Sequence, residues 1–200
     1  MYSRYFKRFF DFFISLLILP FFGLLIAVIG PLIYFEDNGP IFFRQTRRGI
    51  NGSTFRIFKF RTMQINAPDL RVADGSTFTS QTDSRVTRIG QILRRTSVDE
   101  IPQILNILLG DMSFIGPRPT LATEDYELYS PVKKKRLKVR PGLTGYSQAY
   151  YRNSIGAAEK FEKDTYYVDH ISLALDVKIL IRTVFSVVQR KDINANDTRN

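Results

Sequence analysis

The feature that most constrains this chain is an uncharged apolar run near its N-terminus. From Phe12 to Phe35 every residue is apolar, glycine or proline except Ser15 and Tyr34. A run of this length and composition is typical of a membrane helix. Pro20 lies near its middle, where proline removes a backbone donor and clashes with the preceding helical turn. We therefore expect a membrane helix that is broken at Pro20.

Basic residues flank the apolar run on both sides. They are Arg4, Lys7 and Arg8 before it, and Arg44, Arg47, Arg48, Arg56, Lys59 and Arg61 after it. Because Lys and Arg beside a membrane segment favour the cytoplasmic side, both ends should be cytoplasmic. A helix from Phe12 to Leu19 rises only about 12 Å, against a hydrocarbon core of roughly 30 Å. This predicts a re-entrant, monotopic segment, with a plain transmembrane anchor as the alternative; the run is too long for a cleaved signal peptide.

The charge of the chain points to an anionic partner. It carries 29 Lys and Arg against 19 Asp and Glu, a formal net charge of +10. Nucleic acid, phospholipid headgroups and a phosphorylated substrate all remain open on this ground. The absence of cysteine excludes disulfides, thiolate catalysis and cysteine-built zinc sites. The single histidine, His170, cannot form a metal cluster alone, so any metal must be held by oxygen, and we assign His170 no role.

The part that follows the apolar run begins with a hairpin pattern. Ile41 to Phe43 and Phe55 to Phe60 are short aromatic and aliphatic runs, separated by Gly49 and the dipeptide Asn51-Gly52. An Asn-Gly pair between two such runs is a strong hairpin signal. Residues 67–84 are rich in Pro, Gly, Ser, Thr and Asp and read as a long surface loop.

Helical periodicity dominates the remainder. A short helix is expected at Thr87 to Arg95, and a second apolar pattern ends at Gly110. A last amphipathic helix, Leu173 to Arg190, could lie on an anionic membrane surface or pack on the domain core. We predict an α+β fold that is mostly helical with short strands. A membrane segment at 1–36 precedes a cytosolic domain with interfacial helices at 37–191 and a disordered tail at 192–200.

The stretch 87–119 carries the chemistry, because it places Asp99 and Glu100 close in sequence to four arginines. These are Arg88, Arg94, Arg95 and Arg118. In one interpretation Ser97 and Glu100 form a capping box and the acids only complement a helix dipole. In the other, helix amides and arginines lower the pKa of Asp99, which is then an ionised nucleophile beside a diphosphate. Mg²⁺ held by both carboxylates and substrate oxygens would screen the repulsion. Spacing alone leaves both open.

Several motifs in order resemble the monotopic phosphoglycosyl transferases of the bacterial sugar transferase family. They are FKRFFD at the start, KFRTM at 59–63, the DE pair followed by PQ at 102–103, GDMSFIGPRP at 110–119 and RPGLTG at 140–145. The resemblance implies a bacterial cytoplasmic membrane protein with a re-entrant helix and a cytoplasmic catalytic domain. It also implies Mg²⁺ as cofactor and transfer of a sugar-1-phosphate from a UDP-sugar to undecaprenyl phosphate, with loss of UMP. Many members break the membrane helix at Ser-Pro, where this chain has Leu19-Pro20.

The same resemblance assigns roles to individual residues. Asp99 takes the place of the nucleophile that becomes phosphoglycosylated, and Glu100 that of its partner. Phosphate or nucleotide contacts are implied for Lys59, Arg61, Arg88, Arg95 and Arg118, and more weakly for Arg140. Lys59 and Arg61 also share one strand face, since side chains alternate along a strand.

Three other functions compete with this interpretation. A nucleic-acid-binding module would explain the charge and the mixture of aromatic and basic residues at 55–61, but not the apolar run or the acid pair. A glycosyl transferase that moves only the sugar would release UDP, and the chain lacks the Asp-x-Asp pair that such enzymes often use. A structural membrane adaptor would turn over no nucleotide sugar. We therefore expect UDP-sugar, undecaprenyl phosphate and membrane phospholipids as partners, and no nucleic acid.

Overall fold

The computed structural model describes residues 2–70, 83–152 and 154–188. Its helices are α1 Lys7–Asp37, α2 Arg88–Thr96, α3 Ile104–Leu109, α4 Pro131–Arg136, α5 Tyr146–Tyr150, α6 Ala157–Asp169 and α7 Leu173–Val188. A π-helical turn at Tyr2–Phe6 precedes α1, and 3₁₀ segments lie at Ile50–Gly52, Val98–Gln103 (η3) and Tyr126–Leu128. Strands β1 Phe42–Arg48 and β2 Thr54–Phe60 pair antiparallel, while β3 Ser113–Ile115 and β4 Gly142–Thr144 pair parallel. The fold is α+β and mostly helical, as predicted. The predicted tail at 192–200 and most of the predicted loop at 67–84 lie outside the described residues.

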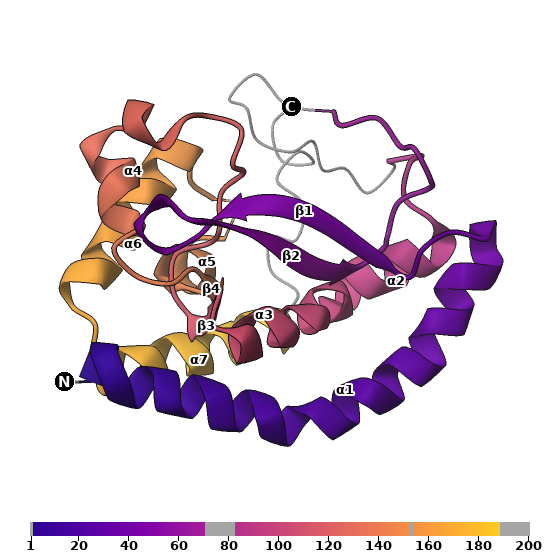
Figure 1. The fold of residues 1–200 in the computed structure, drawn as a ribbon, viewed down its shortest axis with the longest axis horizontal. Coiled ribbons are helices and arrows are strands. Elements are labelled where there is room, and N and C mark those ends of the chain that lie inside the picture. The colour runs from indigo at the N-terminus through magenta and orange to yellow at the C-terminus, as the bar shows by residue number, and fades with distance from the viewer. Residues whose placement is uncertain (1, 71–82, 153, 189–200) are drawn as a thin grey trace.

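Helix α1 is a single continuous helix in which both Pro20 and Pro31 are internal residues. The predicted break at Pro20 is therefore not an interruption of the helix; instead α1 curves along the lower edge of the molecule in Figure 1. Proline removes only one helical hydrogen bond, and packing on both sides of it holds the axis. Phe22, Ile29 and Ile33 belong to a core cluster, which fixes the second half of the helix on the domain.

One side of α1 packs on the domain and the other is bare and apolar. Asp11 and Ser15 are buried against the domain, with Asp11 accepting the Phe114 N–H. On the opposite side, Leu17 and Phe35 are 72% and 77% exposed. By length and composition, α1 is long and apolar enough to cross a membrane. An exposed apolar surface of this kind marks a membrane or protein contact.

The predicted hairpin is confirmed, and β1 extends to Arg48. Asn51, in its turn, has a φ of 53°, a left-handed conformation that asparagine tolerates. The edge of β2 is bound by a buried side chain of α3. Asn106 accepts the Phe58 N–H at 2.9 Å and donates to the Arg56 carbonyl at 2.8 Å, so it takes the place of a neighbouring strand. Figure 1 shows α2 and α3 lying between this hairpin and α1.

The interpretation in which Ser97 and Glu100 form a capping box is wrong. Ser97 has a φ of 58° and ends α2, its N–H reaching the carbonyls of Leu93 and Arg94, and its side chain makes no cap. Residues 98–103 form a 3₁₀ segment rather than the first turns of an α-helix. Pro102 explains this difference, because it has no N–H to offer the carbonyl four residues earlier. The α-helix begins only at Ile104, and Gly110 follows its last residue, Leu109, as the predicted helix stop.

Helix α7 lies beside the start of α1, where Lys7 pairs with Asp176 at 2.6 Å, and it has apolar residues on two faces. Its Ile179 is fully buried in a cluster with Ile115, Ala149 and Tyr167. Other apolar residues of α7 remain exposed, namely Leu173, Val177, Leu180, Ile181, Val184 and Phe185. One face therefore packs on the domain core, which was one of the two interpretations of this helix, and a second apolar face is left open. Residues 189 and 190 of the predicted helix lie outside the described part of the chain.

Candidate active site

Asp99 and Glu100 lie on η3, directly after the left-handed turn at Ser97. Two apolar neighbours on the same segment, Val98 and Ile101, pack against the core cluster that α1 shares with β2 and α2. The acidic pair is therefore held by the same packing that attaches α1 to the domain. Its position is a product of tertiary structure as much as of local sequence.

Glu100 is the anionic centre of a three-residue cluster. Its Oε1 accepts from Lys59 Nζ at 2.5 Å and from Arg118 Nη2 at 2.8 Å. Lys59 reaches it from β2 and is 17% exposed, whereas the Arg118 side chain is 52% exposed. The structure thus brings together three of the residues singled out in the sequence, with one cation shielded and one open to solvent. An open guanidinium beside a carboxylate is suited to bind phosphate bidentately.

The two carboxylates have opposite electrostatic environments. Burial alone would raise the pKa of Glu100, but the charges and hydrogen bonds of Arg118 and Lys59 outweigh it and hold that pKa below its ordinary value. Burial raises the pKa of Asp99 to about 6; Lys59 opposes the rise and the negative charge of Glu100 adds to it. The predicted lowering of the Asp99 pKa is therefore wrong, since the nearby cations donate their hydrogen bonds to Glu100. Asp99 is still mostly ionised at neutral pH.

Arg94 is one of the four arginines near the acidic pair in the sequence, but the family resemblance implied a phosphate contact for its neighbour Arg95 and not for Arg94. Arg94 donates from Nε to Thr62 Oγ1 at 2.9 Å, and its charge, like that of Lys59, opposes the rise of the Asp99 pKa that burial causes. Arg95 is exposed on α2. Helical phase could have distinguished them, because Arg94 follows the buried Leu93 and lies four residues after the buried Gly90.

Arg61 lies in a different place from the one predicted. All five of its N–H groups are occupied, by Asp37, Ile33 O, Pro40 O and Met63 O, and its side chain is buried. It therefore has no N–H left for a phosphate and instead binds the end of α1 to the segment after β2. In this structure Arg61 is a structural contact, and its predicted contact with substrate stays a prediction.

Two further predicted contacts lie apart from the Glu100 cluster. Arg140 donates from Nε to the Gly110 carbonyl at 2.8 Å, at the end of α3, where Arg8 binds the Ile107 and Leu108 carbonyls. Cations are favoured at a helix C-terminus. Arg88 begins α2 with an exposed side chain, about 1.7 turns before Arg94, so the two residues are about 9 Å apart along the helix axis.

Arg136 is a structural contributor that the sequence did not indicate. It is buried, pairs with the buried Asp164 at 2.7 Å, and donates from Nη2 to the Arg118 carbonyl at 3.0 Å. A buried ion pair of this kind fixes the backbone that carries Arg118. Its only sequence signal was the end of a run of lysines, which usually indicates a solvated surface.

The acidic pair has the oxygen ligands that suit Mg²⁺. Within the described residues there is no group of three or more His, Asp or Glu side chains that could hold a metal. Mg²⁺ does not require one, because it is usually bound by one or two carboxylates and completed by water and substrate phosphates. Glu100 Oε1 already accepts from two cations, so Asp99 and the second oxygen of Glu100 are the available ligands.

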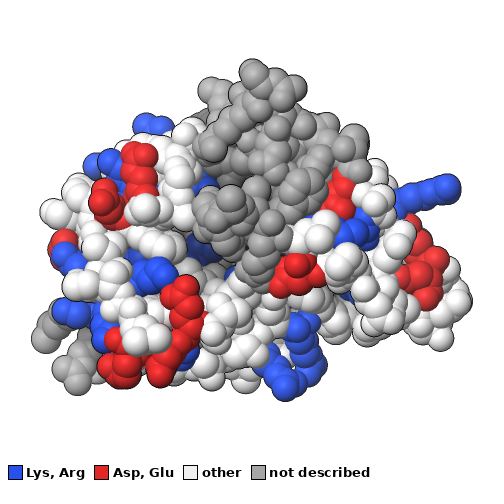
Figure 2. Space-filling model, turned by 90° about the horizontal axis from the view of Figure 1, so that it is seen from above, with Lys and Arg blue, Asp and Glu red and all other residues white. Residues whose placement is uncertain are grey.

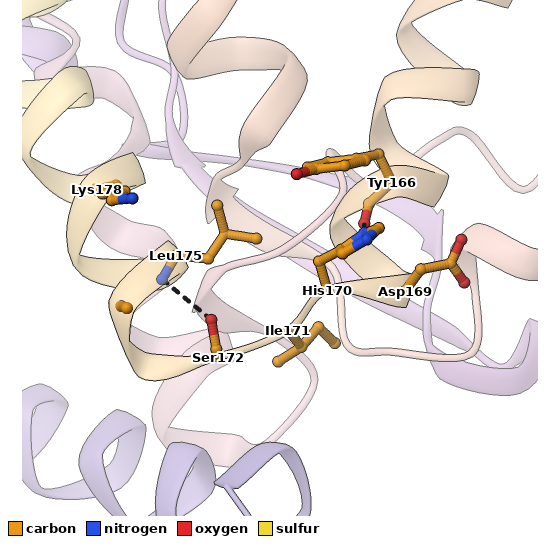
Figure 3. Close-up of a pocket in the computed structure, with 8 residues that line it drawn as sticks. Tyr166, Asp169, His170, Ile171, Ser172, Leu175 and Lys178 are labelled. Atoms are coloured by element: carbon orange, nitrogen blue, oxygen red, sulfur yellow. Dashed lines mark hydrogen bonds between the residues drawn. The ribbon is translucent and has the colours of Figure 1, made fainter.

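A separate cavity of about 410 Å³ lies where α6 meets α7. Figure 3 shows Tyr166, His170, Leu175 and Lys178 around it, with the Leu175 N–H bound to Ser172. His170 stacks on Tyr166 with ring centroids 4.2 Å apart, and its Nδ1 lies 2.8 Å from the Tyr166 carbonyl. The cavity is formed by neither β2 nor η3 and is not part of the acidic site.

The excess positive charge is not gathered into one patch on the face shown in Figure 2. Lys and Arg side chains alternate there with Asp and Glu over the described surface. Some cations of the described chain are paired with carboxylates, for example Lys133 with Glu124 and Lys135 with Asp169.

Comparison with known proteins agrees with the geometry. The pattern of the bacterial sugar transferase family matches residues 2–190. The chain is 39% identical over 188 residues to the uncharacterized sugar transferase EpsL of Bacillus subtilis, covering 94% of this chain and 89% of the relative. It is 40% identical to a UDP-glucose:undecaprenyl-phosphate glucose-1-phosphate transferase of Caulobacter vibrioides, covering 91% and 69%. It is 37% identical to a UDP-N-acetylgalactosamine-undecaprenyl-phosphate N-acetylgalactosaminephosphotransferase of Aeromonas hydrophila, covering 91% and 43%. With the acidic pair, its two cations and the apolar helix in place, this chain belongs to the bacterial sugar transferase family.

Proposed function

We propose that this chain transfers a sugar-1-phosphate from a UDP-sugar to undecaprenyl phosphate, through a covalent intermediate on Asp99 and with release of UMP. The relatives named above for such transfers support the overall reaction. The observation that carries the mechanism is the asymmetry of the acidic pair. Glu100 is bound by Lys59 and Arg118, whereas the Asp99 carboxylate has no hydrogen bond from the described residues.

Asp99 acts as the nucleophile in this proposal. A carboxylate oxygen of Asp99 attacks the phosphorus that bears the sugar, forming an Asp99 O–P bond, and the bond from that phosphorus to the oxygen of UMP breaks. A phosphate oxygen of undecaprenyl phosphate then attacks the same phosphorus. The Asp99 carboxylate leaves and is regenerated, and the sugar ends on a lipid diphosphate. Splitting one displacement into two is the advantage of covalent catalysis.

Three cations oppose the negative charge that gathers during these steps. Lys59 is fixed by Glu100, Arg118 is open to solvent beside it, and Arg94 is held by Thr62. Positioned charges of this kind account for most of catalysis in phosphoryl transfer. Mg²⁺ bound by Asp99 and Glu100 would add charge screening between the carboxylate and the diphosphate. Glu100 acts by fixing the positions of Lys59 and Arg118, both of which it binds.

The membrane arrangement in this proposal is monotopic, with the domain on the cytoplasmic face. It is supported by the exposed apolar side of α1 and by basic residues at both ends of the run. The bend of α1 in Figure 1 returns the chain toward the domain rather than away from it. The open apolar face of α7, bordered by Lys178 and Arg182, would lie in the membrane interface.

The test is a reaction without the lipid acceptor. Enzyme mixed with a panel of UDP-sugars and Mg²⁺ should release about one UMP per active site and add a sugar-phosphate mass to the peptide that contains Asp99. Asp99→Asn should lose both signals while remaining membrane-bound. EDTA should abolish the reaction and added Mg²⁺ should restore it. Release of UDP, or UMP that appears only with acceptor and without an adduct, would refute the covalent route.

A further inference from the structure

A carboxylate outside the acidic site is bound to the helix that leads into it. Glu36, in the last turn of α1, accepts the Arg88 N–H at 2.6 Å and the Ile89 N–H at 3.2 Å, one on each oxygen. These are the first two amides of α2, which have no partner within that helix. The third, from Gly90, is taken by the Thr87 hydroxyl at 3.0 Å. The start of α2 is thus capped jointly by its own residue and by α1.

Helix α2 transmits its position to the acidic site. Arg94 lies in its last turn, and the Ser97 turn connects it to η3 and Asp99. The helix also packs closely on Thr62, which accepts the Thr87 N–H at 3.0 Å. A Cβ atom at Gly90 would come within 2.1 Å of the Thr62 carbonyl oxygen, so only glycine allows this approach. A shift at the start of α2 would therefore be passed to Arg94 and to the acidic pair.

The neighbouring residue attaches α1 to the other side of the same region. Asp37 holds Arg61, directly after β2, so two successive carboxylates of α1 bind the two segments that flank the site. Glu36 itself is exposed, and its removal leaves no cavity in the core. The contacts of Glu36 therefore contribute more to the position of α2 relative to α1 than to the stability of the fold.

We propose that Glu36 is a positioning residue, which aligns Arg94 and the acidic pair with α1 by capping α2. The proposal rests on the proposed function. It links the position of the apolar helix to the reacting groups, so that Arg94 and the acidic pair are correctly placed only when Glu36 of α1 binds the start of α2. Small errors of position are costly in group transfer, where one ångström can lower the rate roughly a hundredfold.

The experiment separates the rate of the first half-reaction from the fraction of active enzyme. Wild type, Glu36→Ala and Glu36→Gln are mixed with UDP-sugar and Mg²⁺ without acceptor, and UMP is followed by rapid quench. Glu36→Ala should keep the burst amplitude of the wild type while its rate constant falls about tenfold. Glu36→Gln retains an amide oxygen for one N–H and should recover part of the rate. Glu124→Ala is the control, because Glu124 is also an exposed carboxylate but pairs with Lys133 instead of capping a helix. Its rate constant should remain within about twofold of that of the wild type.

An unchanged rate constant in Glu36→Ala would overturn the proposal. A loss confined to the amplitude would also overturn it, because that result describes fewer folded molecules with normal geometry. If the wild type releases no UMP without acceptor, the covalent function fails instead. The positioning role is then decided by kcat in full turnover per folded enzyme, where an unchanged Glu36→Ala again overturns it.

Discussion

The nucleophile proposed here should destabilise the fold that carries it. Burial raises the pKa of Asp99 from its ordinary value of 3.8 to about 6, so the folded state binds a proton more tightly than the unfolded state. The resulting loss in the free energy of unfolding is absent below about pH 3.8, grows as the pH rises to about 6, and is complete above that. It corresponds to about 3 kcal/mol at neutral pH as an upper limit. Because the side chain keeps some contact with solvent, we expect about 1–2 kcal/mol.

Asp99→Asn removes the charge and retains the shape, so it should be more stable than the wild type at pH 7 while inactive. For a chain of this size the expected rise in Tm is roughly 2–8 °C. Melting curves in one detergent, with EDTA present to exclude metal binding, should show the advantage at pH 7–8 and its loss near pH 4. An Asn variant that is no more stable at pH 7, or whose advantage does not depend on pH, would refute the reasoning.

Glu100→Gln is the matched control, because it changes the adjacent carboxylate in the opposite environment. The pKa of Glu100 is held below its ordinary 4.5, so its ionised form stabilises the fold above that pH and the contribution is lost as the pH falls. Removing its charge leaves Lys59 and Arg118 without their partner. Glu100→Gln should therefore lower the Tm at pH 7, opposite in sign to Asp99→Asn.

Three further predictions concern activity and topology. The rate of UMP release should fall about tenfold for each pH unit below 6, because only ionised Asp99 attacks; a flat profile from pH 7 to 5 would contradict this. Arg94→Ala should lower kcat/KM at least tenfold and Arg95→Ala less than twofold, measured with one UDP-sugar; equal losses would show that the two arginines are not distinguished by the side of α2 on which they lie. Single cysteines at Ser3 and Asn51 should both resist an impermeant thiol reagent in intact cells, and periplasmic labelling of Ser3→Cys would contradict the re-entrant arrangement.

The sequence alone determined the elements whose signals are local. The Asn51-Gly52 turn and the helix stop at Gly110 each depend on residues next to one another in the chain, and both are found where they were predicted. The apolar helix also follows from local composition, but it lacks the predicted break at Pro20. The identities of Asp99 and Glu100 as the candidate pair also came from the sequence. Their pKa order did not, because burial and the direction of hydrogen bonds depend on residues brought from β2 and from the loop after β3.

Tertiary structure alone decided which cations face the pair. Lys59, Arg61, Arg94 and Arg140 are equally charged in the sequence, yet Arg61 is occupied by Asp37 and Arg140 by the end of α3. The same holds for the course of α1, which remains one helix through its prolines because packing after Pro20 holds it on the domain. Charge and periodicity are properties of the chain, but the assignment of each donor to an acceptor is fixed only when distant segments meet.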